Sequence, residues 1–247
     1  MNVIKRILIT KQGKKFYAKN LNEDLHTQYG FIKKEDLSKA KEGTILKSNT
    51  NKEFSFFVPY FIDLYRKIKR DAQIIPLKDI GIIIAETGIN KKSRILDAGS
   101  GSGALACFLA AIAKEVITYE IREDFIEIVK SNIEFLGIKN IKVKNKDIYK
   151  EIDDKNIDAI ILDLPEPWNA IENCSKALKF GGFLISYSPS VPQVADFVNA
   201  VRKNEDFVYI KTVEIIEREW EIEERRVRPK SKGIGHSGFL SFGRKVQ

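Results

Sequence analysis

Residues that could bind a nucleoside-containing cofactor follow neighbouring apolar runs of the sequence. Ile95–Leu105 reads I-L-D-A-G-S-G-S-G-A-L and turns from a short apolar strand into a helix through three glycines. Val116–Glu120, V-I-T-Y-E, is a second apolar run, and it ends in a carboxylate. Glycines let a ligand approach the backbone closely, and an acid one strand later can accept hydrogen bonds from ribose hydroxyls. D-L-P-E-P-W at Asp163–Trp168 follows a further apolar strand and makes the signal more specific than a glycine-rich turn alone.

Polar side chains follow five successive predicted strands. They are four carboxylates and one phenol: Asp97, Glu120, Asp147, Asp163 and Tyr187. Ligands of open α/β sheets bind outside the carboxyl ends of the strands. One acid at a strand end is often only a turn former, but four of them favour a binding site over four structural turns. We therefore expect these side chains to converge on one edge of a sheet.

Two classes of cofactor compete for this edge. The dinucleotide fingerprint is G-x-G-x-x-G with an acid about 20 residues further on. Here the glycines read G-x-G-x-G, and Glu120 comes 21 residues after Gly99, so the spacing to the acid does not discriminate. The glycine pattern favours S-adenosylmethionine, which has no pyrophosphate that needs a helix N-terminus. Its amino-acid end would lie against the glycine loop, its ribose on Glu120 and its adenine amine on Asp147.

Strands and helices must alternate from Ser93 onward to position these residues. Strands are predicted at Arg94–Asp97, Val116–Glu120, Ile141–Lys144, Ile157–Leu162 and Phe183–Ser188. Helices are predicted at Ala104–Ala113, Glu123–Leu136, Asn169–Leu178 and Val191–Lys203. This alternation predicts an α/β fold with a doubly wound parallel sheet. Two more strands, Phe207–Ile216 and Phe239–Phe242, are joined by a charged loop, Glu217–Ser237, and should pair antiparallel at the sheet edge.

The first 70 residues show a different pattern. Their short β-type runs predict a small β-barrel and lie at Ile4–Thr10, Lys15–Ala18 and Thr44–Lys47. Apolar residues at helical spacing predict a helix over Phe54–Lys69 and another over Leu77–Thr87. We therefore divide the chain into an N-terminal module with a linker helix, residues 1–70, and an α/β domain, residues 71–247.

Charge is distributed unevenly along the chain. The formal net charge is +8, and residues 1–71 contain 16 Lys or Arg against 8 Asp or Glu, which leaves 26 of each for the remainder. A basic excess confined to one module suits binding to a polyanion such as RNA. A lysine-rich solvated surface is the equally weighted alternative.

Other sequence features argue against a membrane span, a signal peptide and a metal site. No run reaches about 18 apolar residues, which predicts no transmembrane helix, and the N-terminus does not resemble a signal peptide. Cys107 and Cys174 have no metal-ligand spacing and are expected to be small buried residues in helices. We therefore expect a cytoplasmic protein without a metal site, a membrane partner or a DNA partner.

Several motifs together resemble the tRNA (adenine-N1)-methyltransferases that act on the T loop, of the bacterial and archaeal homo-oligomeric type. Besides the glycine loop and D-L-P-E-P-W, they are H-T-Q-Y-G (His26–Gly30), A-Q-I-I-P-L-K-D (Ala72–Asp79), Y-E (Tyr119–Glu120), S-P-S-V-P-Q-V (Ser188–Val194), R-P (Arg228–Pro229) and H-S-G-F-L (His236–Leu240). The resemblance runs nearly end to end. D-L-P-E-P-W together with H-S-G-F-L is much more specific than the glycine loop.

This resemblance implies a seven-stranded S-adenosylmethionine-dependent methyltransferase fold, an N-terminal β-barrel domain, a homotetramer and a tRNA substrate. It implies methyl transfer to N1 of adenine 58, and in some archaeal members also of adenine 57. The cofactor-binding residues that it implies are Gln73, Gly99, Gly101, Ser102, Gly103, Ala104, Leu105, Glu120, Asp147, Ile148 and Asp163. The family usually has Tyr-Pro-Lys-Asp where this chain reads Pro76-Leu77-Lys78-Asp79, so a contact from an aromatic residue at position 76 is missing here.

The expected reaction assigns catalytic roles to Asp163 and Tyr187. N1 of a neutral adenine carries a lone pair, so attack on the methyl group needs positioning rather than deprotonation. Asp163 would accept a hydrogen bond from the exocyclic amine and stabilise the developing positive charge. Tyr187 would stack on the base, hydrogen-bond it or form a wall of the cofactor pocket.

Residues of the charged loop are predicted to contact the substrate. His236 gains this role from the resemblance, and the basic residues Arg225, Arg226, Arg228, Lys230 and Lys232 suit phosphate groups. A solvated loop, balanced by its glutamates, explains the same basic run equally well. Trp168 is expected to pack against the sheet rather than to stack on RNA.

Three other functions fit parts of the pattern. One is a methyltransferase with a non-tRNA acceptor, and another is a non-catalytic RNA-binding partner subunit. The second is disfavoured because the chain keeps its glycines and all its strand-end acids. A nicotinamide-dependent oxidoreductase is disfavoured by the glycine spacing.

Overall fold

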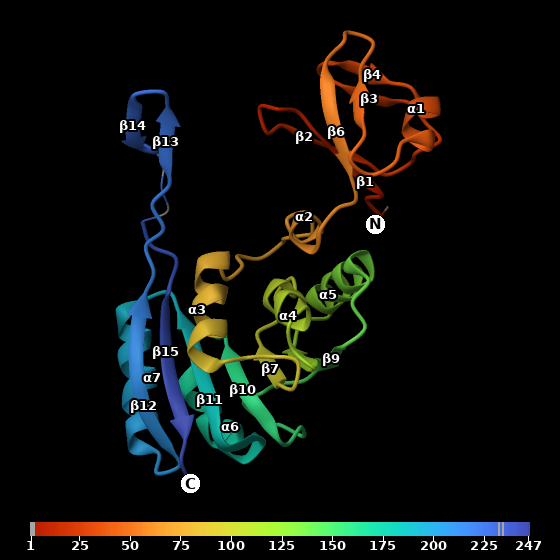
Figure 1. The fold of residues 1–247 in the computed structure, drawn as a ribbon. Coiled ribbons are helices and arrows are strands. Elements are labelled where there is room, and N and C mark those ends of the chain that lie inside the picture. Colours follow the sequence, from red (N-terminus) through yellow and green to blue (C-terminus); the bar gives the residue numbers. More distant parts are fainter. Residues whose placement is uncertain (1–2, 232, 234) are drawn as a thin grey trace. The chain divides into compact units, whose positions relative to one another are not determined.

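The structure is a computed structural model that describes residues 3–231, 233 and 235–247. The chain forms two compact units, which divide after Ile68 (Figure 1). Each unit is described by itself below. Among the described residues, no helix is long and apolar enough to cross a membrane.

The first unit is a β module of short antiparallel strands. Its main sheet has the order β2-β1-β6-β5, formed by β1 (Arg6–Ile9), β2 (Lys15–Ala18), β5 (Ile45–Lys47) and β6 (Glu53–Phe57). A separate hairpin pairs β3 (Leu25–Thr27) with β4 (Gly30–Ile32). The helices are α1 (Lys34–Lys39) and α2 (Phe61–Tyr65). Leu8, Leu37 and Phe54, all fully buried, belong to the core of this unit.

The predicted helix over Phe54–Lys69 is wrong. Its first residues form strand β6, which pairs with β1 and β5, and only α2 is helical. Phe54 and Phe56 are buried on the sheet side, and Ser55 between them is exposed, so the period is two here. A short apolar aromatic run fits both periods, and strand pairing decides the outcome.

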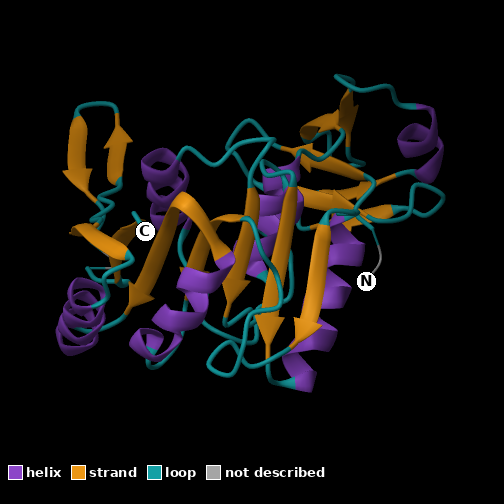
Figure 2. Cartoon of the chain, turned by 90° about the horizontal axis from the view of Figure 1, so that it is seen from below, coloured by secondary structure: helices purple, strands orange, loops and turns teal. Residues whose placement is uncertain are grey.

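The second unit contains one mixed sheet of seven strands, in the order β12-β15-β11-β10-β7-β8-β9. Its strands are β7 (Arg94–Ala98), β8 (Glu115–Glu120), β9 (Ile141–Asn145), β10 (Ile157–Leu162), β11 (Leu178–Ser188), β12 (Phe207–Glu214) and β15 (Phe239–Lys245). Its helices are α3 (Leu77–Thr87), α4 (Ala104–Ala110), α5 (Glu123–Leu136), α6 (Ile171–Ala177) and α7 (Val191–Lys203), with a 3₁₀ turn at Pro167–Ala170. The sheet and its helices are seen from below in Figure 2.

Six strands of this sheet run in the same direction, and one, β15, runs in the opposite direction. β7 to β11 pair in parallel, whereas β15 lies between β11 and β12 and is antiparallel to both. The predicted α/β fold and the antiparallel closing strands are therefore confirmed. The parallel strands bring their carboxyl ends to one edge, where the predicted polar residues lie.

Helices cover both faces of the sheet. Phe197 of α7 and Cys174 of α6 pack on one face with Leu162, and Ile83 of α3 and Leu109 of α4 pack on the other. Cys174, like Cys107 of α4, is fully buried, as the sequence predicts. The side chain of Trp168 also packs against the first cluster, which confirms its predicted contact with the sheet.

The charged segment between β12 and β15 is not a simple loop. It contains a two-stranded hairpin of β13 (Trp220–Glu223) and β14 (Arg226–Pro229), with Glu224 in a left-handed turn. Glutamates on β13 face arginines on β14, and these cross-strand charges pair. Apolar and charged residues alternate on both sides of the turn, and this alternation indicates a hairpin. The high charge content of the segment instead favours the prediction of a loop.

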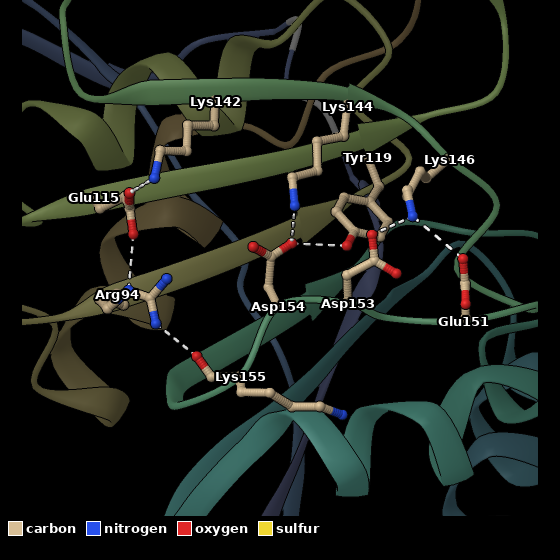
Figure 3. A network of polar contacts seen from close by, with 10 residues as sticks. All are labelled: Arg94, Glu115, Tyr119, Lys142, Lys144, Lys146, Glu151, Asp153, Asp154 and Lys155. Atoms are coloured by element: carbon tan, nitrogen blue, oxygen red, sulfur yellow. Dashed lines mark hydrogen bonds and ion pairs between the residues drawn. The ribbon is translucent and has the colours of Figure 1, made fainter.

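Edge strand β9 carries lysines that pair with acids of neighbouring elements (Figure 3). Lys142 Nζ lies 2.5 Å from Glu115 Oε1, and Lys144 Nζ lies 2.7 Å from Asp154 Oδ2. The Tyr119 hydroxyl donates to the same Asp154 oxygen at 2.7 Å. Lysines on an edge strand also discourage pairing with another sheet.

The aromatic contact between α7 and the sheet yields a stability prediction. Phe197 has 0 % exposure, whereas Phe180 in β11 is 78 % exposed. We expect Phe197→Ala to lower the free energy of unfolding by about 3–5 kcal/mol because it leaves a cavity. Phe180→Ala, the matched control, should change it by less than about 0.5 kcal/mol. Urea unfolding of both variants checks this, and equal losses would show that the α7 contact is not part of the core.

Candidate active site

The glycine loop between β7 and α4 depends on three residues in the left-handed region. The φ angles of Gly99, Gly101 and Gly103 are 84°, 50° and 73°. A Cβ atom on Gly99 would lie 2.1 Å from the backbone oxygen of Asp163, and one on Gly103 would lie 2.9 Å from Val129 Cγ1. The loop therefore packs its backbone against the end of β10 and against α5, and side chains would prevent both contacts.

A narrow pocket lies between this loop and the segment before α3. Its walls are Gln73, Ile74, Ile75, Asp97, Gly99, Ser100, Gly101, Ser102, Ala104, Leu105 and Asp163. Six of the predicted cofactor residues from the loop and the preceding segment are thus brought together, along with Asp163. The Ser102 hydroxyl is buried and has no hydrogen-bond partner among the described residues. An orphaned polar atom beside bare backbone fits a small ligand with polar ends.

Glu120 links the second strand end to the glycine loop. Its Oε2 accepts a hydrogen bond from Gly101 N at 3.0 Å, and its Oε1 accepts from Ile121 N and Arg122 N at 2.9 and 3.0 Å. A carboxylate has about four acceptor positions, so Oε2 keeps one for a ligand hydroxyl. The acid predicted to bind the ribose is therefore fixed in place next to the pocket.

Asp147 lies in a neighbouring hollow with Ile121, Asn145, Lys146, Lys150 and Glu151. Asp147 Oδ1 accepts from Tyr149 N at 2.9 Å. Lys146, whose ammonium contacts Asp153 and Glu151, ties the two ends of this loop together (Figure 3). Ile148 is 3 % exposed and belongs to the core beneath the loop.

Carboxylates with raised pKa values surround the glycine loop. Burial raises the pKa of Asp97 to about 7, Thr118 opposes the shift by donating at 2.8 Å, and the charges of Asp163 and Glu120 add to it. Burial also raises the pKa of Asp163 to about 6, although this side chain is partly exposed at the pocket. Such a cluster favours a positively charged ligand, whose charge would restore ionisation of the acids.

The cysteines offer no nucleophile. Burial raises the pKa of Cys107 to about 12 and raises that of Cys174 as well. A thiol that stays protonated is a weak nucleophile. Among the described residues, no group of histidine, cysteine and acidic side chains could hold a metal ion.

Tyr187 is the penultimate residue of β11 and lies next to Asp163. In the parallel register Leu162 lies opposite Ser186, so the next residues, Asp163 and Tyr187, are neighbours across the two strand ends. The Tyr187 side chain is 5 % exposed, and burial raises its pKa to about 12. Its hydroxyl is buried beside that of Ser237, whose contact opposes the effect of burial on the Tyr187 pKa.

His236 is exposed, and both of its ring nitrogens contact protein groups. Its Nδ1 lies 2.6 Å from Glu214 Oε1, and its Nε2 lies 2.9 Å from the Pro189 oxygen. Both partners are acceptors, so this geometry suits the doubly protonated ring, and the hydrogen bond to Glu214 is the main cause of its raised pKa. A role of His236 in substrate binding stays a prediction.

The predicted phosphate-binding arginines lie on the hairpin and do not line the glycine-loop pocket. Arg228 Nε lies 2.7 Å from Glu221, and Arg226 lies 3.6 Å from Glu223. Arg225 is exposed beside the turn. Lys230 contacts Glu219, and Lys232 is outside the described residues.

A buried cluster at the start of α3 has no counterpart among the predicted site residues. Lys78, Asp79 and Ser237 form hydrogen bonds with one another beside Tyr187. The sequence contains one hint, because two of the motifs that carry the resemblance, A-Q-I-I-P-L-K-D and H-S-G-F-L, contribute to this cluster.

Comparisons with known proteins agree with this geometry. The chain matches the family model for the tRNA methyltransferase complex GCD14 subunit over residues 65–238. A tRNA (adenine(57)-N(1)/adenine(58)-N(1))-methyltransferase TrmI of Methanocaldococcus jannaschii is 36% identical, over 97% of this chain and 94% of that protein.

Two crystal structures are similar along the whole chain. One is a tRNA (m1A58) methyltransferase TrmI from Aquifex aeolicus, with a TM-score of 0.82 and 28% identity, over 98% of this chain and 97% of that one. The other is described as an S-adenosylmethionine-dependent O-methyltransferase from Thermotoga maritima, with a TM-score of 0.88 and 29% identity, over 100% of this chain and 94% of that one.

The contact between Gly99 and Asp163 yields the second prediction. Gly137, which ends α5, has φ 67° and would place a Cβ in open space, so Gly137→Ala isolates the conformational cost of about 1–2 kcal/mol. We expect Gly99→Ala to lower the free energy of unfolding by at least about 2 kcal/mol more than this control, because its Cβ clashes with backbone. Urea unfolding measures both, and losses of the same size would refute the close approach.

Proposed function

The chain belongs to the family of the tRNA methyltransferase complex GCD14 subunit, and from this premise we propose that it transfers a methyl group from S-adenosylmethionine to N1 of a T-loop adenine in tRNA. The proposed target is adenine 58, and adenine 57 is included because the archaeal relative is named for both positions. The observation that carries the proposal is the convergence of Asp163 with the glycine loop in one pocket. We further propose that the enzyme works as a cytoplasmic homotetramer.

The fold and the family imply S-adenosylmethionine as the methyl donor, and the pocket residues suit it. Its amino-acid end would be held by the glycine loop and by Gln73, with Ser102 as a free donor. Glu120 would take the ribose hydroxyls and Asp147 the adenine amine. The raised pKa values of the surrounding acids fit a ligand that carries a positive charge.

Bound S-adenosylmethionine supplies an electrophilic methyl group on its sulfonium. The target N1 has a free lone pair, so the protein has to orient the base and exclude water rather than remove a proton first. The Asp163 carboxylate would accept from the exocyclic amine, which becomes more acidic as positive charge moves onto the base. Tyr187, the neighbouring strand end, would contact the same base.

The T-loop adenine is buried in folded tRNA, and reaching it requires the base to flip out. Binding energy from elsewhere must offset this cost. The N-terminal module carries the basic excess of the chain, 16 Lys or Arg against 8 Asp or Glu in residues 1–71, and Arg225, Arg226 and Arg228 add charge on the hairpin. We propose that both contact phosphates.

A methyltransferase with another acceptor is the main competing function, because one similar structure is described as an O-methyltransferase. The basic module and the carboxylate at the acceptor side favour RNA. A non-catalytic RNA-binding subunit could lose its pocket, whereas this chain keeps Gly99, Gly101 and Asp163 in its pocket.

Transfer to a defined adenine tests the proposed function. With labelled S-adenosylmethionine, we expect the protein alone to methylate an unmodified tRNA transcript, and mass spectrometry should place the methyl group on N1 of adenine 58 or 57. A transcript with both adenines replaced by guanine is the matched control and should accept no label. Equal labelling of both transcripts, or none of either, would contradict the proposal.

Asp163 should control both the rate and its pH dependence. We expect Asp163→Ala to lower kcat at least about 100-fold with an unchanged melting temperature, because an orienting charge is lost. Since the pKa of Asp163 is raised to about 6, wild-type kcat/KM should fall as the pH drops through about 6 and the carboxylate is protonated. Glu166→Ala, which removes an exposed acid of the same loop, should keep wild-type activity. A fully active Asp163→Ala variant would exclude this role.

A further inference from the structure

The segment that leads into β15 is held by three separate elements. His236 contacts Glu214 at the end of β12 and the carbonyl of Pro189 just after β11. Its ring lies 4.8 Å from that of Phe239, and Ser237 bonds to α3. The segment is thereby fixed across the carboxyl end of β11, which is where Tyr187 lies.

Ser237 is held by a buried ion pair at the start of α3. Lys78 Nζ lies 2.8 and 2.9 Å from the two Asp79 oxygens and donates to Ser237 Oγ at 2.5 Å. Ser237 Oγ in turn donates to Asp79 Oδ2 at 2.8 Å. Asp79 has 0 % exposure, and Lys78 is nearly buried, so the three groups satisfy one another with little access to water.

This arrangement fixes the direction of the Ser237 proton. A hydroxyl has one proton and two lone pairs, and a hydrogen bond to a carboxylate is stronger than one to a neutral group. The proton therefore points to Asp79, one lone pair accepts from Lys78, and the second lone pair stays free. The hydroxyl beside it is that of Tyr187, which is buried and makes no other hydrogen bond among the described residues.

Gly238 allows Tyr187 to come this close. A Cβ on Gly238 would lie 2.4 Å from Tyr187 Cζ and 2.8 Å from its hydroxyl oxygen. The phenol end of Tyr187 thus rests against the backbone next to Ser237. Glycine at position 238 is explained by this approach.

We propose that Ser237, fixed by the Lys78–Asp79 ion pair, is a positioning residue that orients the hydroxyl of Tyr187 toward the acceptor base. The inference rests on the proposed function and assigns to it residues outside the cofactor pocket. When the Tyr187 proton points to Ser237, the lone pairs of its oxygen stay free to accept a hydrogen bond, and Asp163 is the neighbour of Tyr187 across the strand ends.

Two acceptors side by side match the chemistry of adenine. The exocyclic amine has two N–H groups, so Asp163 and Tyr187 can each accept one. A purine with a carbonyl at the same position, such as guanine, would bring its oxygen against two acceptors and be repelled. The orientation imposed by Ser237 would therefore contribute to the choice of base.

A measurement on the protein without tRNA tests the contact itself. With tyrosines labelled by ¹³C at Cζ, the Tyr187 resonance can be assigned from Tyr187→Phe. We expect Ser237→Ala to shift this resonance, because the hydroxyl loses its partner. Ser241→Ala is the matched control: Ser241 is a buried serine of β15 that bonds to Thr212, and its loss should leave the resonance in place. An unmoved resonance in Ser237→Ala would overturn the proposal, whether or not tRNA is methylated.

A double-mutant cycle tests the functional part. We expect Ser237→Ala to lower kcat about tenfold, which corresponds to about 1.4 kcal/mol, with an unchanged Kd for S-adenosylmethionine. In a Tyr187→Phe background the same substitution should lower kcat less than about twofold, since it acts through the lost hydroxyl. If Ser237→Ala lowered kcat by the same factor in both backgrounds, Ser237 would have only a structural role and the proposal would be overturned. A wild-type enzyme inactive on tRNA would instead contradict the proposed function, and the resonance would still decide the contact.

Discussion

The site depends on the close approach of two strand ends. Gly99, just past β7, has no Cβ, and its Cα therefore lies against the backbone carbonyl of Asp163, just past β10. Asp163 N also donates to the Ala98 oxygen at 2.9 Å, which continues the pairing of the strands into the loop. This contact places a carboxylate next to the glycine loop. Glu120 completes the arrangement from the neighbouring strand, because its carboxylate accepts from Gly101 N.

Acidic side chains gathered at the carboxyl edge of the sheet repel one another, and a positively charged ligand can relieve this electrostatic cost. Asp97 is 1 % exposed and close enough to Asp163 and Glu120 for their charges to raise its pKa. Without a counter-ion, Asp97, whose pKa is raised to about 7, keeps its proton in part of the molecules at neutral pH. A sulfonium ligand would supply positive charge where water cannot reach, so binding should be coupled to proton release. The same field favours the positive charge that a methylated adenine acquires.

Much of the α/β unit could be predicted from periodicity because its elements are long or uniformly apolar. Helices α3, α5 and α7 and strand β10 begin and end where the sequence places them, and glycines follow α3 and α5 as helix ends require. Phe54–Phe57 could not be assigned in this way, since partners on both sides turn an ambiguous apolar run into a strand. The convergence of the strand-end acids could be predicted from the sequence because parallel strands have their carboxyl ends at one edge of the sheet. The contact of Ser237 with Asp79 could not, because the two residues are 158 positions apart and neither belongs to a local pattern.

The most direct test of a cofactor site at the carboxyl edge of the sheet is a crystal structure of the full chain with S-adenosylhomocysteine, the demethylated form of the donor. We predict that its amino-acid end contacts the glycine loop, its ribose hydroxyls bond to Glu120, its adenine amine faces Asp147, and its sulfur points to the space beside Asp163. A ligand bound away from the glycine loop, or an Asp163 side chain turned out of the cavity, would contradict the assignment of this edge as the site of methyl transfer.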